Sequence, residues 1–131
     1  MNVHSYPYDE TILPAMPVAD INFISPHSQE RANAAQAIID SGSDGTMAPL
    51  ELLDEIGALS MGTAVMRGVW GQGRRVDIFM VNIEIGSYHL PGIRVAGVAE
   101  ATEIILGRNV LNQIKIVLNG PANMLEIPSD E

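Results

Sequence analysis

Asp40 is the residue of this chain best placed to do chemistry, because it ends an apolar run and begins a loop of small residues. The run at residues 34–39 leads directly into the sequence Asp-Ser-Gly-Ser-Asp-Gly at residues 40–45. An aspartate in this position can present its carboxylate to a cavity, and a neighbouring glycine lets another backbone approach closely. The competing interpretation is an Asx turn, in which the carboxylate only bonds its own backbone. Taken alone, the Asp-Ser-Gly triplet favours the turn.

The other polar residues form no second site of this kind. His4, His27 and His89 are scattered and lack the clustered spacing of metal ligands, so neither a metal nor another cofactor is predicted. Ser41 and Ser43 have no base at a recognisable spacing that would make either hydroxyl a nucleophile. The glycine-rich stretch 68–73 does not match the dinucleotide-binding fingerprint, and no helical pattern follows it. Any site would therefore be built around Asp40.

The elements that must position Asp40 are mostly short strands separated by turns about every 8–12 residues. Strands are predicted at residues 21–24, 34–39, 76–85, 116–118 and 124–127. Residues 89–98 are predicted to form further short strands, broken at Pro91 and Gly92 and again at Gly97. Pro49 opens a short helix that Gly57 ends, and a second helical pattern begins at Arg108. The pattern favours a small all-β barrel or sandwich with one short helix near the C-terminus over an alternating α/β fold.

The chain of 131 residues has the length of one domain, for which about 100–150 residues are common. Residues 1–19 show no hydrophobic periodicity and contain three prolines, so we predict an extended, flexible or strap-like N-terminal arm. Its Tyr6 and Tyr8 could dock on a partner or on the domain itself. Residues 20–131 are then predicted to form the domain.

The charge and composition exclude several classes of function. Seven Lys and Arg against sixteen Asp and Glu give a net charge of −9, which argues against binding nucleic acid. The absence of cysteine rules out disulfides, thiol catalysis and thiolate metal sites. No segment has the ~20 consecutive apolar residues of a membrane helix, and the N-terminus lacks the features of a secretory signal. A protein of the cytoplasm that does not associate with membranes is predicted.

Two segments taken together resemble the retropepsin-like aspartic proteases, a family that includes the retroviral proteases and bacterial relatives. One is Ala-Ile-Ile-Asp-Ser-Gly-Ser-Asp at residues 37–44, and the other is Ile-Ile-Leu-Gly-Arg-Asn-Val-Leu-Asn-Gln-Ile at residues 104–114. The family pattern is an apolar run into Asp-Thr/Ser-Gly-Ala/Ser, then a glycine-rich flap. Two apolar residues, a Gly and often Arg-Asp/Asn follow before a helix. Both halves occur here in that order, and the resemblance covers about residues 20–127.

The resemblance implies a role for each matching residue. Asp40 would be the catalytic aspartate. Ser41 would supply the hydroxyl that ties two active-site loops together, Gly42 would accept the substrate backbone, and Asp44 and Arg108 would form an ion pair near the substrate and dimer contact. Ile105, Leu106 and Gly107 would pack beneath the Asp loop. The flap would consist of Gly68, Val69, Trp70, Gly71, Gln72 and Gly73.

Two residues depart from the family pattern. Ser41 stands where retroviral enzymes usually have Thr, so the hydroxyl remains but a methyl group is lost from the packing. Ser43 replaces the usual Ala, which adds a hydroxyl that could tune the pKa of the catalytic pair. Neither departure removes a group that catalysis requires.

The number of Asp-Ser-Gly motifs has a consequence of its own. Two facing aspartates share one proton, so that one activates a water and the other polarises the peptide carbonyl. This chain has a single such motif, so the second carboxylate must come from a second copy of the chain. The sequence thus predicts a retropepsin-like lobe of closed β-barrel type that works as a homodimeric aspartic endopeptidase on extended peptides. One alternative is a dimeric module of the same fold that binds peptides without cleaving them. A second, weaker alternative is a plain β-barrel domain that binds a partner, in which both motifs match by coincidence.

Overall fold

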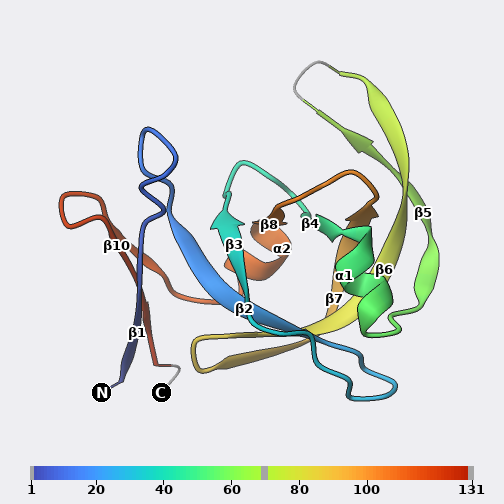
Figure 1. Ribbon diagram of the computed structural model, residues 1–131, viewed down its shortest axis with the longest axis horizontal. Coiled ribbons are helices and arrows are strands. Elements are labelled where there is room, and N and C mark those ends of the chain that lie inside the picture. Colours follow the sequence, from blue (N-terminus) through green and yellow to red (C-terminus); the bar gives the residue numbers. More distant parts are fainter. Residues whose placement is uncertain (1, 69–70, 130–131) are drawn as a thin grey trace.

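The computed structural model describes residues 2–68 and 71–129, and strands are its main secondary structure (Figure 1). No helix in this part of the chain is long and apolar enough to cross a membrane. Its elements, in order, are β1 (Val3–Pro7), β2 (Val18–Ile24), β3 (Ala35–Ile39), β4 (Thr46–Pro49), α1 (Leu50–Glu55), β5 (Ser60–Arg67), β6 (Gly73–Ile85), β7 (Tyr88–Val98), β8 (Ile104–Leu106), α2 (Arg108–Leu111), β9 (Val117–Asn119) and β10 (Met124–Pro128).

Six strands close into a barrel, as the spacing of short strands and turns predicts. The strands pair in the order β2-β3-β8-β4-β7-β6, and a further pairing of β2 with β6 closes the ring. Alternate residues of the long strands point inward, so that Phe23, Val81, Ile83 and Val95 are almost completely buried. Burying a side chain of this size stabilises the fold by roughly 1.5–3 kcal/mol. The predicted all-β barrel is therefore confirmed.

The position of Asp40 follows from β3, a strand that the sequence predicted, and from β8 and β4, two short strands that it did not predict. β3 is flanked on one side by β8, which runs parallel to it with Ile39 opposite Leu106. β8 pairs on its other side with β4, a strand that was not predicted, where Met47 lies opposite Ile105. The loop at residues 40–45 connects β3 to β4 and therefore passes over the end of β8 (Figure 1).

The structure corrects the prediction of short strands at residues 89–98. β7 is one continuous strand of 11 residues that pairs with β6. Pro91 has no backbone N–H to give to a ladder, and here the register shifts between Val81 and Ile83 so that the pairing resumes beyond it. Gly92 adopts a φ of 66°, and its N–H donates to Asn82 Oδ1 at 3.1 Å. The proline thus sits at a bulge within a strand.

The N-terminal segment is extended, but the structure gives it fixed partners. β1 pairs with β10 along five residues, and β9 completes a three-stranded sheet with β10 as its centre. Tyr6 and Tyr8 pack against the barrel core, which is the second of the two dockings considered for them. Residues 3–7 of the predicted extended, flexible or strap-like arm therefore form a strand of the terminal sheet.

A polar cluster ties the turn after β2 to the β6–β7 hairpin. Arg31 forms an ion pair with Glu84, and His89 Nδ1 lies 2.8 Å from Glu84 Oε2. The hydrogen bond from Arg31, supported by the charges of Arg31 and His89, holds the pKa of Glu84 below its usual value. The carboxylate is thus kept ionised where two segments meet.

Candidate active site

The Asp40 loop is fixed by hydrogen bonds that leave half of the carboxylate open. The Asp40 N–H donates to Leu106 O at 3.0 Å, which ties the loop to the end of β8. The Gly42 N–H donates to Asp40 Oδ1 at 2.9 Å, and the Ser43 N–H donates to Asp40 O at 3.1 Å. The Asx-type bond considered from the sequence is therefore present. No described residue bonds the other oxygen, Oδ2, of this half-buried side chain.

Gly107 lies against the loop so closely that no side chain fits there. A Cβ built on Gly107 would stand 2.0 Å from Gly45 O and 2.5 Å from Gly45 C. Real Cβ atoms essentially never come within 3.0 Å of another heavy atom. Leu106 is fully buried, and its carbonyl accepts the hydrogen bond from Asp40, so Leu106 and Gly107 both lie against the loop. Ile105 pairs with β3 and β4 on either side.

Thr46 is a buried residue whose hydroxyl makes two hydrogen bonds, and the sequence did not indicate this role. The Gly107 N–H donates to Thr46 Oγ1 at 3.1 Å, and this hydroxyl donates to Asn109 Oδ1 at 2.7 Å. Asn109 then donates from Nδ2 to Arg94 O at 2.9 Å on β7. One hydroxyl therefore links β4 to the glycine and to the start of α2. A lone threonine directly after a polar loop gave no signal of this role.

Removing the Thr46 hydroxyl should destabilise the fold measurably. In Thr46→Val, which has nearly the same shape, the buried Gly107 N–H loses its acceptor, and we expect a loss of about 1–3 kcal/mol in the free energy of unfolding. Urea unfolding followed by circular dichroism measures this loss. Thr46→Ser keeps the hydroxyl and is the matched control. If the Thr46→Val and Thr46→Ser variants were equally stable, the Thr46 hydroxyl would not hold the loop in place.

Arg108 is bound differently from the way the family resemblance implies. Its guanidinium donates to Ser41 O at 2.8 Å, and its backbone N–H donates to Ser43 O at 2.8 Å. Within residues 2–68 and 71–129 it makes no salt bridge with Asp44, so the implied ion pair is absent from the single chain. The backbone carbonyls of the loop take the donors instead, and the exposed Asp44 carboxylate stays in solvent.

The two serines of the loop have separate surroundings. Ser41 is exposed, and its hydroxyl makes no hydrogen bond with the described part of the chain. The Ser43 hydroxyl donates to Gly45 O at 2.7 Å, so it shapes the loop and makes no hydrogen bond to Asp40. Ser41 is therefore the hydroxyl that is open to a second molecule.

A cavity of about 430 Å³ separates the Asp40 loop from the β5–β6 hairpin. Its walls come from the loop, from β5, from β6 and β7, and from the start of α2. The residues that line it are Ser43, Asp44, Gly45, Thr46, Met47, Ala64, Val65, Met66, Arg67, Val76, Ile78, Arg94, Ala96 and Asn109. The space is open on one side to solvent and is mostly apolar where β5 faces it.

The described residues of the predicted flap lie at the end of this hairpin. Arg67 on β5 pairs with Gly73 on β6, and the Gly71 N–H donates to Gly68 O at 3.0 Å. Gly68, Gly71, Gln72 and Gly73 therefore belong to a hairpin that projects beyond the barrel (Figure 1). Val69 and Trp70, which were also predicted to belong to the flap, lie outside the described residues.

Titratable groups in the described chain do not gather into a metal centre. No three His, Asp or Glu side chains of residues 2–68 and 71–129 could hold one ion together. The candidate site therefore consists of one carboxylate, a loop held by β8 and α2, and a cavity under a hairpin.

Comparison with known proteins identifies the architecture. No family model and no curated protein matches the sequence. Among solved structures, a retropepsin-like aspartic protease from Rickettsia conorii is similar with a TM-score of 0.62 at 11% identity, covering 96% of this chain and 91% of that chain. The retroviral protease-like domain of Ddi1 from Leishmania major is similar with a TM-score of 0.55 at 19% identity, covering 87% of this chain and 89% of that chain. The Simian Foamy Virus (mac) protease is similar with a TM-score of 0.51 at 14% identity, covering 73% of this chain and 92% of that chain. The likeness is one of fold, and the predicted retropepsin-like lobe is confirmed.

Proposed function

We propose that this chain, which has the retropepsin-like fold, is an aspartic endopeptidase whose working unit is a homodimer. The observation that carries the proposal is the Asp40 loop. Its backbone is fixed by the end of β8, its carboxylate is half-buried, and one carboxylate oxygen has no bond within the described chain. A carboxylate held in this way is suited to act on a molecule that is not part of the same chain.

The second carboxylate would come from Asp40 of a second copy. The sequence has one Asp-Ser-Gly motif, so a symmetric dimer with its two-fold axis between two Asp40 side chains is the simplest way to form a pair. The exposed Ser41 hydroxyl lies in the same loop and would bond the partner loop. Val117 and Leu118 on the edge strand β9, at 39% and 53% exposed, offer apolar surface to a partner.

The two Asp40 carboxyls of the dimer form a dyad, which would cleave a peptide by sharing one proton. Two adjacent carboxyls cannot both ionise, so one is a base and the other an acid. The base takes a proton from a water, which attacks the peptide carbonyl, and the acid donates a hydrogen bond to the developing oxyanion. The tetrahedral intermediate then breaks its C–N bond while the carboxyl that took the proton from water gives it to the leaving amine, which restores one protonated and one ionised Asp40.

The substrate would bind as an extended strand beneath the hairpin. The cavity between the Asp40 loop and β5 supports this arrangement, since an added strand can bond a hairpin through its main chain. Closing the hairpin over the peptide would exclude water from the dyad.

Activity should depend on protein concentration and on pH. We expect hydrolysis of a diverse peptide library by the wild-type chain, faster at mildly acidic than at alkaline pH, because one carboxyl must carry a proton. The specific activity should fall on dilution as sedimentation shows the dimer dissociating. Because two chains bring together about −18 of charge, added salt should strengthen the dimer.

Two outcomes would contradict the proposal. A fully active monomer in sedimentation at the assay concentration would rule out the shared dyad. Peptides that bind without being cleaved at any pH would instead favour the binding module of the same fold.

A further inference from the structure

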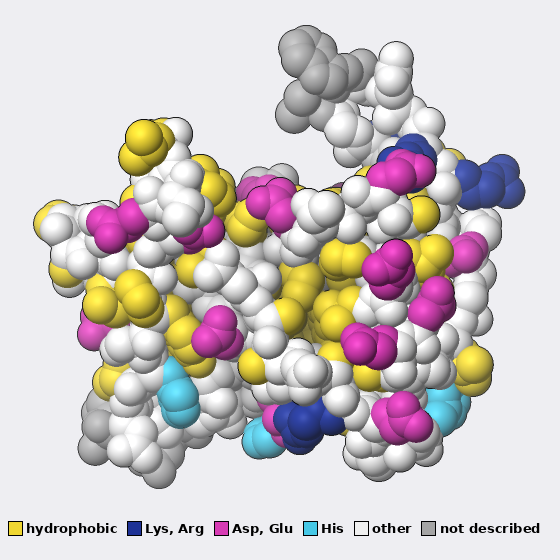
Figure 2. All heavy atoms as spheres, viewed as in Figure 1, with side chains coloured by type: hydrophobic (Ala, Val, Ile, Leu, Met, Phe, Trp, Pro, Cys, Tyr) yellow, Lys and Arg dark blue, Asp and Glu magenta, His cyan; other side chains and the backbone are white. Residues whose placement is uncertain are grey.

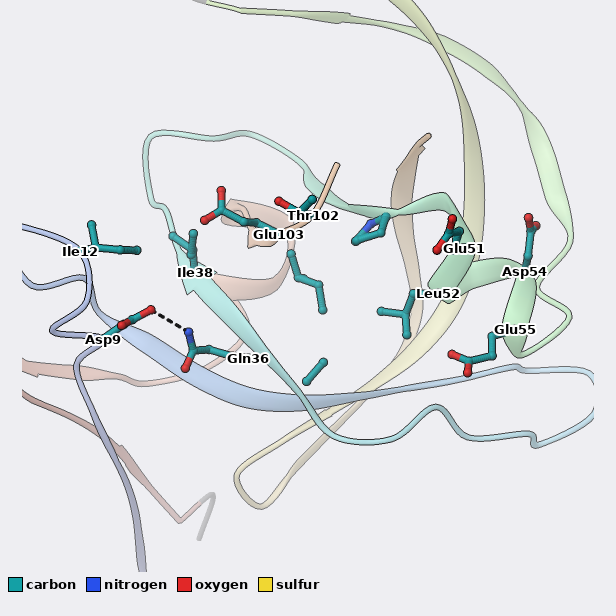
Figure 3. A pocket seen from close by; sticks show the side chains of 13 residues that line it. Asp9, Ile12, Gln36, Ile38, Glu51, Leu52, Asp54, Glu55, Thr102 and Glu103 are labelled. Carbon is teal, nitrogen blue, oxygen red and sulfur yellow. Dashed lines mark hydrogen bonds between the residues drawn. The ribbon is translucent and has the colours of Figure 1, made fainter. Parts of the chain in front are cut away.

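A groove of about 830 Å³ lies outside the cavity of the proposed active site. It runs between the segment before β2 and helix α1, across β3 and the start of β8 (Figure 3). Asp9 and Ile12 lie at one end of the groove, and Asp54 and Glu55 lie at the other (Figure 3). It shares no lining residue with the cavity beneath the hairpin.

The floor of the groove is apolar. Ile38 of β3, Leu52 of α1 and Ile104 of β8 line it together with Ile12, although Ile38 and Leu52 are only half-buried. Figure 2 shows the result from outside as a hollow with a hydrophobic floor and acidic side chains around it. An apolar floor of this kind favours a ligand that buries apolar side chains.

All the charged residues that line the groove are acidic. Five of the thirteen lining residues are Asp or Glu and none is Lys or Arg: Asp9, Glu51, Asp54, Glu55 and Glu103. Hydrogen bonds from Thr11 and Gln36 hold the pKa of Asp9 below its usual value, so this end of the rim stays ionised into mildly acidic solution. The complementary ligand therefore carries positive charge along its length.

Helix α1 carries three of these carboxylates in an arrangement that disfavours the helix itself. Glu51, Asp54 and Glu55 are spaced i, i+3 and i+4, so all three exposed side chains lie on one face. Like charges at this spacing repel one another and destabilise a helix. A cationic ligand in the groove would relieve that repulsion.

Other occupants fit less well. No three carboxylates of the described chain come close enough to hold one metal ion, which favours charges spread along a ligand. A second copy of this chain brings a net charge of −9, and nucleic acid would be repelled by the same rim. The ligand that best complements the apolar floor and the acidic rim is an extended polypeptide in which apolar residues alternate with basic ones.

We propose that this groove is a docking site for an extended basic segment of a protein partner, with apolar side chains on the floor and alternating Lys or Arg at the acidic rim. Alternation places the two kinds of side chain on opposite faces of an extended strand. The proposal concerns binding alone and does not require the dyad.

The test is the binding of a labelled octapeptide that alternates Lys with Leu, measured by fluorescence anisotropy on the full-length chain. The same peptide with Glu in place of Lys should not bind. In Glu51→Gln/Glu103→Gln we expect affinity to fall about five- to ten-fold, as for two exposed charge pairs. The control Glu30→Gln/Asp77→Asn changes the net charge equally at exposed sites off the groove and should keep its affinity. The peptide should also raise the melting temperature of the wild-type chain.

Binding should be the same in wild type and in Asp40→Asn. Equal weakening by the groove variant and its control would mean general attraction to an acidic protein and would overturn the proposal. Binding that disappears in Asp40→Asn would place the peptide at the Asp40 loop, which overturns the docking site but leaves the proposed protease standing. Peptide hydrolysis that fails while groove binding persists would overturn the protease alone.

Discussion

Replacing Asp40 by Asn is expected to lower the turnover of peptide hydrolysis by at least about 1000-fold, since both acid–base catalysis and oxyanion stabilisation are lost. Asparagine has the shape of aspartate, and its amide oxygen can still accept the hydrogen bond from the Gly42 N–H. It cannot take a proton from water. Because a homodimer carries the substitution twice, neither half of the pair would be left to act alone. The measurement is the initial rate on a cleaved peptide at mildly acidic pH.

The matched control for Asp40→Asn is Asp77→Asn on the exposed face of β6. It makes the same chemical change away from the loop and should keep its rate within a factor of about two, as surface substitutions generally have little effect. Both variants should melt near the wild-type temperature. If Asp40→Asn retained a rate close to that of Asp77→Asn, the carboxylate would have no part in hydrolysis.

Replacing Gly107 by Ala is expected to cost at least about 3 kcal/mol of the free energy of unfolding, at the upper end of what overpacking costs. The added methyl would stand 2.0 Å from Gly45 O, and a backbone carbonyl cannot rotate away as a side chain could. Relief requires moving the Asp40 loop or the end of β8. Urea unfolding followed by circular dichroism measures the loss, and the hydrolysis rate should fall with it.

Gly45→Ala tests the other side of the same contact. A Cβ at Gly45 would meet nothing within 4 Å, so this variant should lose less than about 1 kcal/mol, the usual cost for a surface site. The two variants differ only in which of two touching glycines carries the methyl group. Equal stability of the two would mean that the loop yields freely, and the fixed position assigned to Asp40 would be wrong.

Those strands and contacts that leave a pattern in neighbouring residues could be predicted from the sequence. The alternation along β6 and the apolar run of β3 mark strands whose inward residues are fixed by a period of two. The two motifs around Asp40 and Gly107 indicated correctly that these segments meet. β7 was misread because Pro91 and Gly92 resemble a turn, whereas the bulge that absorbs them depends on Asn82 in the neighbouring strand.

Features that depend on several distant segments could not be predicted. The role of Thr46 requires Gly107 and Asn109 to meet it, about 60 residues away along the chain. Arg108 was assigned to Asp44 by resemblance, but carbonyls of the loop lie within its reach and take its donors. The acidic groove is built from four separate segments, none of which carries a motif of its own.

The terminal sheet constrains the order in which the chain can fold during synthesis. β1 is made first among the described strands and β10 last, yet Val3 pairs with Pro128, a separation of 128 − 3 = 125 residues. β1 therefore has no strand to pair with until residues 124–128 have left the ribosome, and contacts so distant along the chain are slow to form. Until then its unpaired edge is exposed to other strands, which makes the nascent chain vulnerable to aggregation.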